Sequence, residues 1–329
     1  MGDTIIRHID CNVKGCNGKP KKTIKTNDSL STELCAQCEQ VVSYTRPEAL
    51  KEGKKSKVAK APPQKKLKQE IELAILTGDI EINKEYNEKC EATMSRMGNA
   101  SVDYIFTSPP YNVGSGVDGH KYGGENSFSD NMSQQQYYEW NVKLVNEFLR
   151  VTKNHVFYNN QILTNNKAAL FTLIGHFADK IKELIIWDKT KRAPASAPGM
   201  LDSEFELMIV FSNIDPHSRV FPDANFAGNK GTGLSNILRV RPTKNTYADI
   251  NKAVFPLNLP RTVIRAFGKK GSVWYDPFGG TGTTAEACIM EERNWILSEM
   301  SKDSVIKAIK PRVKNAKSKI TLKFEEDEE

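Results

Sequence analysis

The sequence predicts an α/β fold with a doubly wound, mostly parallel sheet, preceded by a small cysteine-bearing unit. Three observations lead to this prediction. From about residue 71 onward, short apolar runs alternate with segments of helical periodicity. Two of the apolar runs end in proline or glycine motifs, and four of the six cysteines lie before residue 45. Alternating strands and helices indicate a parallel sheet covered on both faces, which binds ligands at the carboxyl ends of its strands.

The expected elements follow in chain order. Val102–Thr107 is an apolar run that ends in polar and proline residues, as a buried parallel strand does. Residues 133–151 carry apolar side chains at helical spacing. The other expected elements are strands at 155–158, 184–187 and 207–211, a helix at 261–267, a strand at 272–275, a helix at 284–292 and a strand at 295–297.

The composition excludes several classes of protein. Of 329 residues, 39% are hydrophobic and 26% charged, as in a soluble globular protein, and no run of 18 apolar residues predicts a membrane span. The first ten residues do not resemble a secretion signal. We therefore expect a cytoplasmic protein, of a bacterium or a virus-infected host cell. The net charge of +7 favours a polyanionic partner.

The domain organisation follows from changes in composition. We predict a cysteine-bearing unit at 1–45, a basic Lys/Pro-rich linker at 46–70, a large α/β domain at 71–315 with insertions at about 112–131 and 189–245, and a tail with an acidic end at 316–329.

The run from Asp276 to Thr284 has the order acid, glycine turn, helix start. Its glycines let the backbone approach a ligand closely, and a helix start offers free N–H groups. The spacing is that of neither a P-loop nor a dinucleotide-binding turn. A plain tight turn is the alternative, but Glu299 ends the next expected strand, where a carboxylate can accept both hydroxyls of a ribose. A nucleoside cofactor is therefore expected.

A second motif, Ser108-Pro109-Pro110-Tyr111, follows the strand that ends at Thr107. The exocyclic amine of cytosine or adenine is a poor nucleophile, because its lone pair is delocalised into the ring. Ser108 and the Pro109 carbonyl can accept hydrogen bonds from such an amine, and the prolines offer no competing N–H. Tyr111 can stack on an extruded base. A proline turn with ordinary packing of Tyr111 is the alternative.

The two motifs resemble those of a known family. Ser108–Tyr111 is similar to the Ser/Asp-Pro-Pro-Tyr signature of DNA amino-methyltransferases, and Asp276–Thr284 resembles their S-adenosylmethionine loop. Their order is that of the permuted, beta class. Gly78-Asp79, Phe255-Pro256 and residues 293–299 also resemble segments of that family, so the resemblance covers about residues 71–315.

The resemblance implies roles for individual residues. Ser108, Pro109, Pro110 and Tyr111 would form the catalytic pocket, and Asp79 would reach the cofactor's adenine. The cofactor site would be lined by Thr107, Pro109, Pro256, Asp276, Phe278, Gly279, Gly280, Gly282, Thr283 and Glu299. The implied reaction is direct transfer of the methyl group from the sulfonium to the amine, without a covalent enzyme intermediate.

Base identity and target recognition are less sharply specified. Serine in the first signature position is commoner among cytosine-N4 enzymes, which favours cytosine; adenine N6 remains the alternative. Leu297-Ser298 departs from the glycine that often precedes the ribose acid in the family. Arg192, Arg239 and Arg241 lie in basic, irregular segments and are expected to contact DNA, the alternative being exposed loops with ordinary charge.

Cys11-x4-Cys16 and Cys35-x2-Cys38 have the spacing of a structural four-cysteine zinc site. A unit of about 45 residues needs such a staple in order to fold. Free thiols or a redox pair are alternatives, and His8 is a weaker ligand candidate.

Three further functions stay open on the sequence: RNA methylation, protein amine methylation, and non-catalytic nucleic-acid binding by a zinc-bearing relic. The expected partner is double-stranded DNA, and a cognate restriction nuclease is left open as a second partner.

Overall fold

The computed structural model describes residues 20–27, 30–35, 41–45, 80–114, 130–193, 198–226, 233–251 and 253–326. The chain divides into two compact units, Met1–Pro62 and Pro63–Glu329, which are described separately.

The first unit contains a three-stranded antiparallel sheet. Its strands are β1 (Pro20–Asn27), β2 (Leu30–Cys35) and β3 (Val41–Thr45), with β2 in the middle. Of the expected zinc ligands, Cys35 ends β2, but its side chain lies outside the described part of the chain. Cys11, Cys16 and Cys38 also lie outside it, as do the predicted linker and Gly78-Asp79.

The second unit is built on one eight-stranded sheet. Its strands are β4 (Lys84–Tyr86), β5 (Val102–Thr107), β6 (Thr152–Asn160), β7 (Ile181–Ala193), β8 (Ser203–Ser212), β9 (Ile237–Arg239), β10 (Val273–Asp276) and β11 (Asn294–Ser298). The order across the sheet is β4-β11-β10-β5-β6-β8-β7-β9. All pairings are parallel except those of β8, which runs antiparallel to both β6 and β7. The prediction of a mostly parallel sheet is confirmed.

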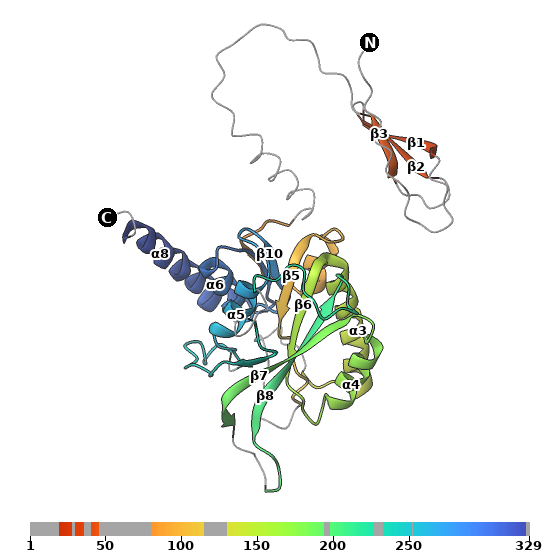
Figure 1. The fold of residues 1–329 in the computed structure, drawn as a ribbon. Helices are drawn as coiled ribbons and strands as arrows, with labels where there is room; N and C mark the ends of the chain where they lie inside the picture. Colours follow the sequence, from red (N-terminus) through yellow and green to blue (C-terminus); the bar gives the residue numbers. More distant parts are fainter. Residues whose placement is uncertain are drawn as a thin grey trace. The chain divides into compact units, whose positions relative to one another are not determined.

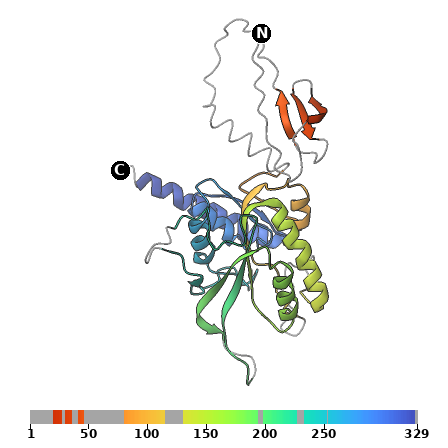
Figure 2. The same cartoon turned by 45° about the vertical axis from the view of Figure 1, so that its right-hand side comes forward.

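Helices cover both faces of this sheet (Figures 1 and 2). One face carries α2 (Cys90–Ser95), α3 (Gln134–Val151) and α4 (Lys167–His176). The other carries α5 (Asn258–Ala266), α6 (Thr283–Met290), and a C-terminal run of α7 (Lys302–Ser304), a π-helical turn (Val305–Ile309) and α8 (Lys310–Glu326). Within the described residues, no helix is both long and apolar enough to cross a bilayer.

The two-sided burial explains the continuous apolar runs in the sequence. In β5, Ile105 packs into the core under α3 and α4, whereas Tyr104 and Phe106 pack into the core under α5 and α6. Successive side chains therefore pack against opposite helical layers, and both faces of the strand are apolar.

Local signals place several element boundaries. Helix α3 begins after Ser133, whose hydroxyl accepts from the Gln136 amide while the Gln136 side chain accepts from the Ser133 amide. Residues 316–326, which we predicted as part of a tail, continue helix α8.

The direction of the strands defines one functional edge. The chain leaves β4, β5, β6, β7, β9, β10 and β11 at the same edge of the sheet, because these strands are mutually parallel or linked through the antiparallel β8. Both sequence motifs follow strands that end there. The β7–β8 hairpin extends beyond the other strands (Figure 1).

Candidate active site

The two motifs lie side by side on neighbouring strands. Strand β10 pairs with β5, with Tyr275 opposite Ile105. At their ends, the Thr107 hydroxyl donates to the Asp276 carboxylate, with 2.9 Å between Oγ1 and Oδ1. These residues are 169 positions apart in the sequence. The Pro-Pro-Tyr segment and the glycine turn therefore leave the sheet at adjacent positions.

The Asp276 carboxylate holds the glycine turn in place through hydrogen bonds. It also accepts from the Phe278 amide at 3.1 Å and from the Thr284 hydroxyl at 2.6 Å. Burial raises the pKa of Asp276 to about 6, against the lowering effect of these hydrogen bonds. Asp276 thus ties β5, the turn and the start of α6 together through its own contacts.

Glu299 lies against the same turn from the next strand. It follows β11, and its two carboxylate oxygens accept from the Gly280 amide at 2.8 Å and the Ser301 amide at 2.7 Å. Burial raises the pKa of Glu299 to about 7. The paired oxygens of Glu299 at the turn have the chemistry that a ribose diol requires.

Two glycines are needed for the shape of the turn. A Cβ on Gly279 would lie 3.1 Å from the Leu297 Cβ, which shows how closely the turn approaches β11. Gly282 caps α6 with a φ of +82°, and a Cβ there would lie 3.2 Å from the Ile309 Cα. A side chain at Gly279 would push the turn away from β11, and one at Gly282 would push it away from the segment that contains Ile309.

The remaining predicted cofactor residues lie in different surroundings. Phe278 is half-buried with its ring edge-on to Trp140, at 5.9 Å between centroids, and Pro256 is buried beside Phe255. Thr283 is buried and its hydroxyl accepts from Arg312 at 3.0 Å, so it faces α8. Asp79 lies outside the described residues.

Arg312 is a contributor that the sequence did not reveal. Its guanidinium also bonds Glu286 at 3.0 Å and lies 4.7 Å from the centre of the Tyr247 ring. It thereby links α8 to the start of α6. No motif surrounds Arg312, so only the packing of α8 identifies it.

The predicted catalytic residues form a hydrogen-bonded corner. The hydroxyls of Ser108 and Tyr111 bond each other. Pro109 is buried, and the Pro110 carbonyl accepts from the Tyr137 hydroxyl at 2.7 Å. Burial raises the pKa of the Tyr111 hydroxyl well above its ordinary value, with the nearby Glu206 charge acting in the same direction.

Three polar side chains that we did not predict complete this corner. The Tyr111 hydroxyl donates to Glu206 at 2.9 Å, and the Asn159 amide donates to the Tyr111 oxygen at 2.8 Å and to Glu206 at 2.6 Å. Lys189 makes an ion pair with Glu206 at 2.9 Å. In the sequence, Glu206 could have been noticed as the one carboxylate in the apolar run 205–211, since a carboxylate is unusual in a strand buried on both faces.

The predicted insertion at about 112–131 is described only at its ends, because residues 115–129 lie outside the described part. Asn112 is buried with a φ of +58°, and its amide bonds Asp130 at 2.6 Å. The Asn112 side chain donates to the carbonyls of Met132 and Asn165, each at 2.8 Å. These bonds anchor both ends of the loop beside Tyr111.

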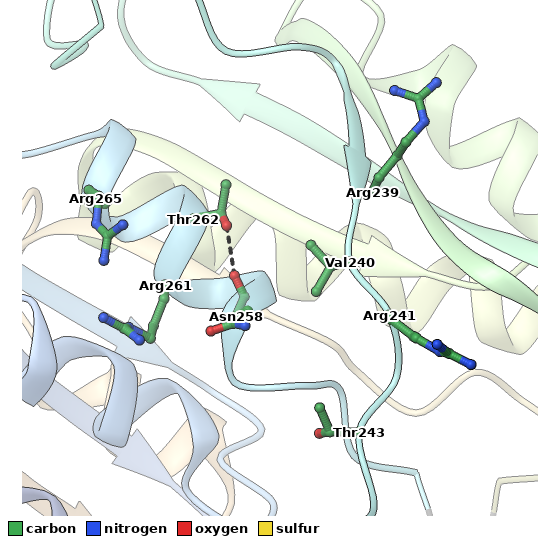
Figure 3. Close-up of a pocket in the computed structure, with 8 residues that line it drawn as sticks. All are labelled: Arg239, Val240, Arg241, Thr243, Asn258, Arg261, Thr262 and Arg265. Atoms are coloured by element: carbon green, nitrogen blue, oxygen red, sulfur yellow. Dashed lines mark hydrogen bonds between the residues drawn. The ribbon is translucent and has the colours of Figure 1, made fainter.

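Two of the predicted DNA contacts line one depression of about 510 Å³ between the chain after β9 and α5 (Figure 3). Arg239 and Arg241 are exposed, and Figure 3 shows both side chains pointing away from α5. On the opposite wall, Arg261 and Arg265 are both paired with Glu291. Arg192 lies in β7, but its side chain is outside the described part.

No group of three or more His, Cys, Asp or Glu side chains within the described ranges could hold a metal ion. Cys90 and Cys288 are buried free thiols in α2 and α6.

The glycine turn, Glu299 and the adjacent Ser-Pro-Pro-Tyr corner all lie within a segment that matches a family of DNA methylases. Residues 102–310, more than half of the chain, match the N6_N4_Mtase family of DNA methylases. The chain belongs to this family.

Individual relatives agree with this assignment. Type II methyltransferase M.BamHI of Bacillus amyloliquefaciens is 25% identical over 260 residues, which are 71% of this chain and 58% of that protein. Type II methyltransferase M.MjaI of Methanocaldococcus jannaschii is 41% identical over 71 residues, which are 21% of this chain and 23% of that protein. The chain thus spans less than two thirds of the length of these relatives.

Among solved structures, the cytosine-N4-specific PvuII DNA methyltransferase is similar in fold, with a TM-score of 0.54 and 17% sequence identity. The similarity covers 68% of this chain and 83% of that one.

Proposed function

We propose that this chain transfers a methyl group from S-adenosylmethionine to the exocyclic amine of a base at specific sites in double-stranded DNA. The observation that carries the proposal is the 2.9 Å contact between Thr107 and Asp276. It holds the segment suited to a base amine next to the turn suited to a nucleoside cofactor. A reacting pair bound at these two places would be positioned without further rearrangement of the sheet.

The residues at the turn fit S-adenosylmethionine. Glu299 would accept the ribose hydroxyls, Gly280 would allow close approach of the ligand to the backbone, and Phe278 would offer an apolar wall. Asp276 and Arg312 would keep the turn in shape through their own contacts. When bound, the cofactor supplies an electrophilic methyl group.

The corner formed by Ser108 and Tyr111 fits an extruded base. Inside a duplex the amine is paired and stacked, so the base has to leave the helix before it can reach this corner. Ser108 and the Pro109 carbonyl would accept from the amine, and the Tyr111 ring would stack on the base.

We favour cytosine N4 as the acceptor. Serine stands at the first signature position of this chain, and the PvuII enzyme of similar fold is cytosine-N4-specific. Adenine N6 is the alternative, since the same corner would hold either amine.

The test is transfer of labelled methyl groups to unmethylated plasmid DNA, followed by digestion to nucleosides. We expect N4-methylcytosine, with RNA of the same sequence as an inactive control. Ser108→Ala should lower transfer at least about 100-fold, because it removes an acceptor used in the transition state, while the affinity for S-adenosylmethionine stays unchanged. A product found only in RNA or in protein would refute the proposal.

Binding to DNA would involve arginines on and near the β7–β8 hairpin. Arg239 and Arg241 lie at the same edge of the sheet as the site, and Arg192 belongs to the β7–β8 hairpin. Guanidinium groups there would neutralise phosphates or contact base edges. Arg239 also pairs with Asp188 at 3.4 Å, so DNA would compete with that carboxylate.

The N-terminal unit would bind zinc through Cys11, Cys16, Cys35 and Cys38. The spacing of the two cysteine pairs supports this part of the proposal, together with the small size of the unit. Its role would be DNA affinity or partner recognition, separate from the chemistry.

A further inference from the structure

The catalytic corner continues into a chain of hydrogen bonds that ends on a carboxylate. From Ser108 the chain passes to the Tyr111 hydroxyl and then to Glu206, at 2.9 Å from Tyr111. Glu206 is 7% exposed and lies on β8, whereas Ser108 and Tyr111 follow β5. Lys189, at 2.9 Å on β7, supplies the opposite charge that a buried carboxylate needs.

The carboxylate sets the direction of every bond in this chain. An ionised carboxylate only accepts, so the single hydrogen of the Tyr111 hydroxyl points to Glu206. Asn159 donates to both Tyr111 and Glu206 and leaves that direction unchanged. The Tyr111 oxygen can then only accept from Ser108, and the Ser108 hydrogen is used in that bond. The lone pairs of the Ser108 oxygen remain available to a base amine.

We infer that Glu206 is the terminal acceptor of a Ser108–Tyr111–Glu206 chain that makes Ser108 an acceptor for the target amine and carries the amine proton away. This inference rests on the proposed methyl transfer to a base amine. Glu206 acts through Tyr111 and Ser108, so it is a positioning and proton-accepting residue that does not contact the base. The raised pKa of Tyr111 keeps its hydroxyl protonated, as the chain requires.

The proton balance is complete without a further reactant. The amine nitrogen uses its lone pair to bond the methyl carbon, while the carbon–sulfur bond breaks and its electron pair stays on the sulfur as a neutral thioether. The nitrogen, now positively charged, gives one proton to the Ser108 oxygen. The Ser108 hydrogen passes to Tyr111, and the Tyr111 hydrogen passes to Glu206. One proton leaves the base and one arrives on the carboxylate.

Three variants test the chain in the full-length protein, by single-turnover methyl transfer to unmethylated plasmid DNA. Glu206→Gln keeps the size of the side chain but removes its basicity, and we expect a rate about 100-fold lower, within the range of general-base effects. Glu206→Asp retains a carboxylate and should recover most of that loss. Tyr111→Phe keeps the ring but interrupts the chain. The double variant Glu206→Gln/Tyr111→Phe should be no slower than the slower single variant, because both substitutions interrupt the same hydrogen-bond chain.

Binding measurements separate this role from a structural one. The affinities of each variant for S-adenosylmethionine and for plasmid DNA should stay within about twofold of wild type, with the loss confined to the transfer rate. Glu183→Gln is the matched control. Glu183 lies near the start of β7, whereas Lys189 lies toward its end, and Glu183 pairs with Arg219. Its transfer rate should equal that of wild type.

The failures of the two proposals are distinguishable. Wild-type protein that binds S-adenosylmethionine but methylates no DNA would refute the proposed function. An active wild type with a Glu206→Gln rate within threefold of it, or single-variant losses that multiply in the double variant, would overturn the inference about Glu206 alone. Loss of S-adenosylmethionine binding in Glu206→Gln would also overturn it, by showing that Glu206 supports the fold.

Discussion

At the scale of single residues, two buried carboxylates, Asp276 and Glu299, make different contacts at the glycine turn. Asp276 is engaged by Thr107, Phe278 and Thr284, and so it shapes the turn. Glu299 is bound through backbone amides of the turn and of the segment after β11. The burial that positions Glu299 also raises its pKa to about 7, so its charge changes near neutral pH.

This pKa predicts how cofactor affinity depends on pH. Glu299 can accept from both ribose hydroxyls only as a carboxylate, and its ionised fraction rises from about one tenth at pH 6 to about nine tenths at pH 8 for a pKa near 7. The affinity of the wild-type protein for S-adenosylmethionine should therefore increase over this range. Titration calorimetry at several pH values measures it.

Glu299→Gln should bind S-adenosylmethionine more weakly and lose the part of the pH dependence that Glu299 contributes. Glu292→Gln is the control, because Glu292 lies in the same region, is exposed and pairs with Lys270. An unchanged pH slope in Glu299→Gln would show that another group is responsible.

At the scale of elements, the turn between β10 and α6 depends on close packing as much as on backbone freedom. Gly282 combines a φ of +82° with the nearness of Ile309, which belongs to the π-helical turn before α8. Arg312 joins α8 to α6 from the other side. The C-terminal helices therefore support the glycine turn, although they contain none of the motif residues.

Gly282→Ala should destabilise the protein by about 2 kcal/mol or more, since a left-handed alanine costs about 1–2 kcal/mol before any clash is added. Urea unfolding of the full chain measures the effect. Gly175→Ala in α4 is the matched control, because its added Cβ would meet no atom within 4 Å apart from its chain neighbours and the backbone of its own helix. We expect the Gly175 variant to be as stable as wild type or slightly more so. Equal losses in both would contradict the packing argument.

At the scale of the whole molecule, the chain separates into two compact units. Both halves of the proposed site belong to the unit Pro63–Glu329, and the cysteine-bearing unit lies within Met1–Pro62. The described contacts of the glycine turn all come from residues after 80.

Deletion of residues 1–60 should therefore leave the affinity for S-adenosylmethionine unchanged. Weaker DNA binding by the deleted protein would fit a role of the first unit in recognition. Calorimetry of full-length and truncated protein decides the point, and a large loss of cofactor affinity would reject this division of labour.

Much of the fold was predictable because its signals are local. Val102–Thr107 forms β5 with the expected bounds, since a strand buried on both faces requires a continuous apolar run. Other elements lacked such signals. Strand β9 has three residues and only Leu238 is buried in it, and the antiparallel direction of β8 depends on its neighbours, which no periodicity encodes.

The sequence by itself determined the two motifs, their order and the strands that carry them, because proline, glycine and apolar runs restrict the backbone within a few residues. Only the tertiary structure decided which side chains complete the site. Glu206 is 95 residues from Tyr111 and meets it because β8 lies next to β6 in the sheet. The partner of a buried carboxylate is set by strand order, which is a property of the whole chain's packing.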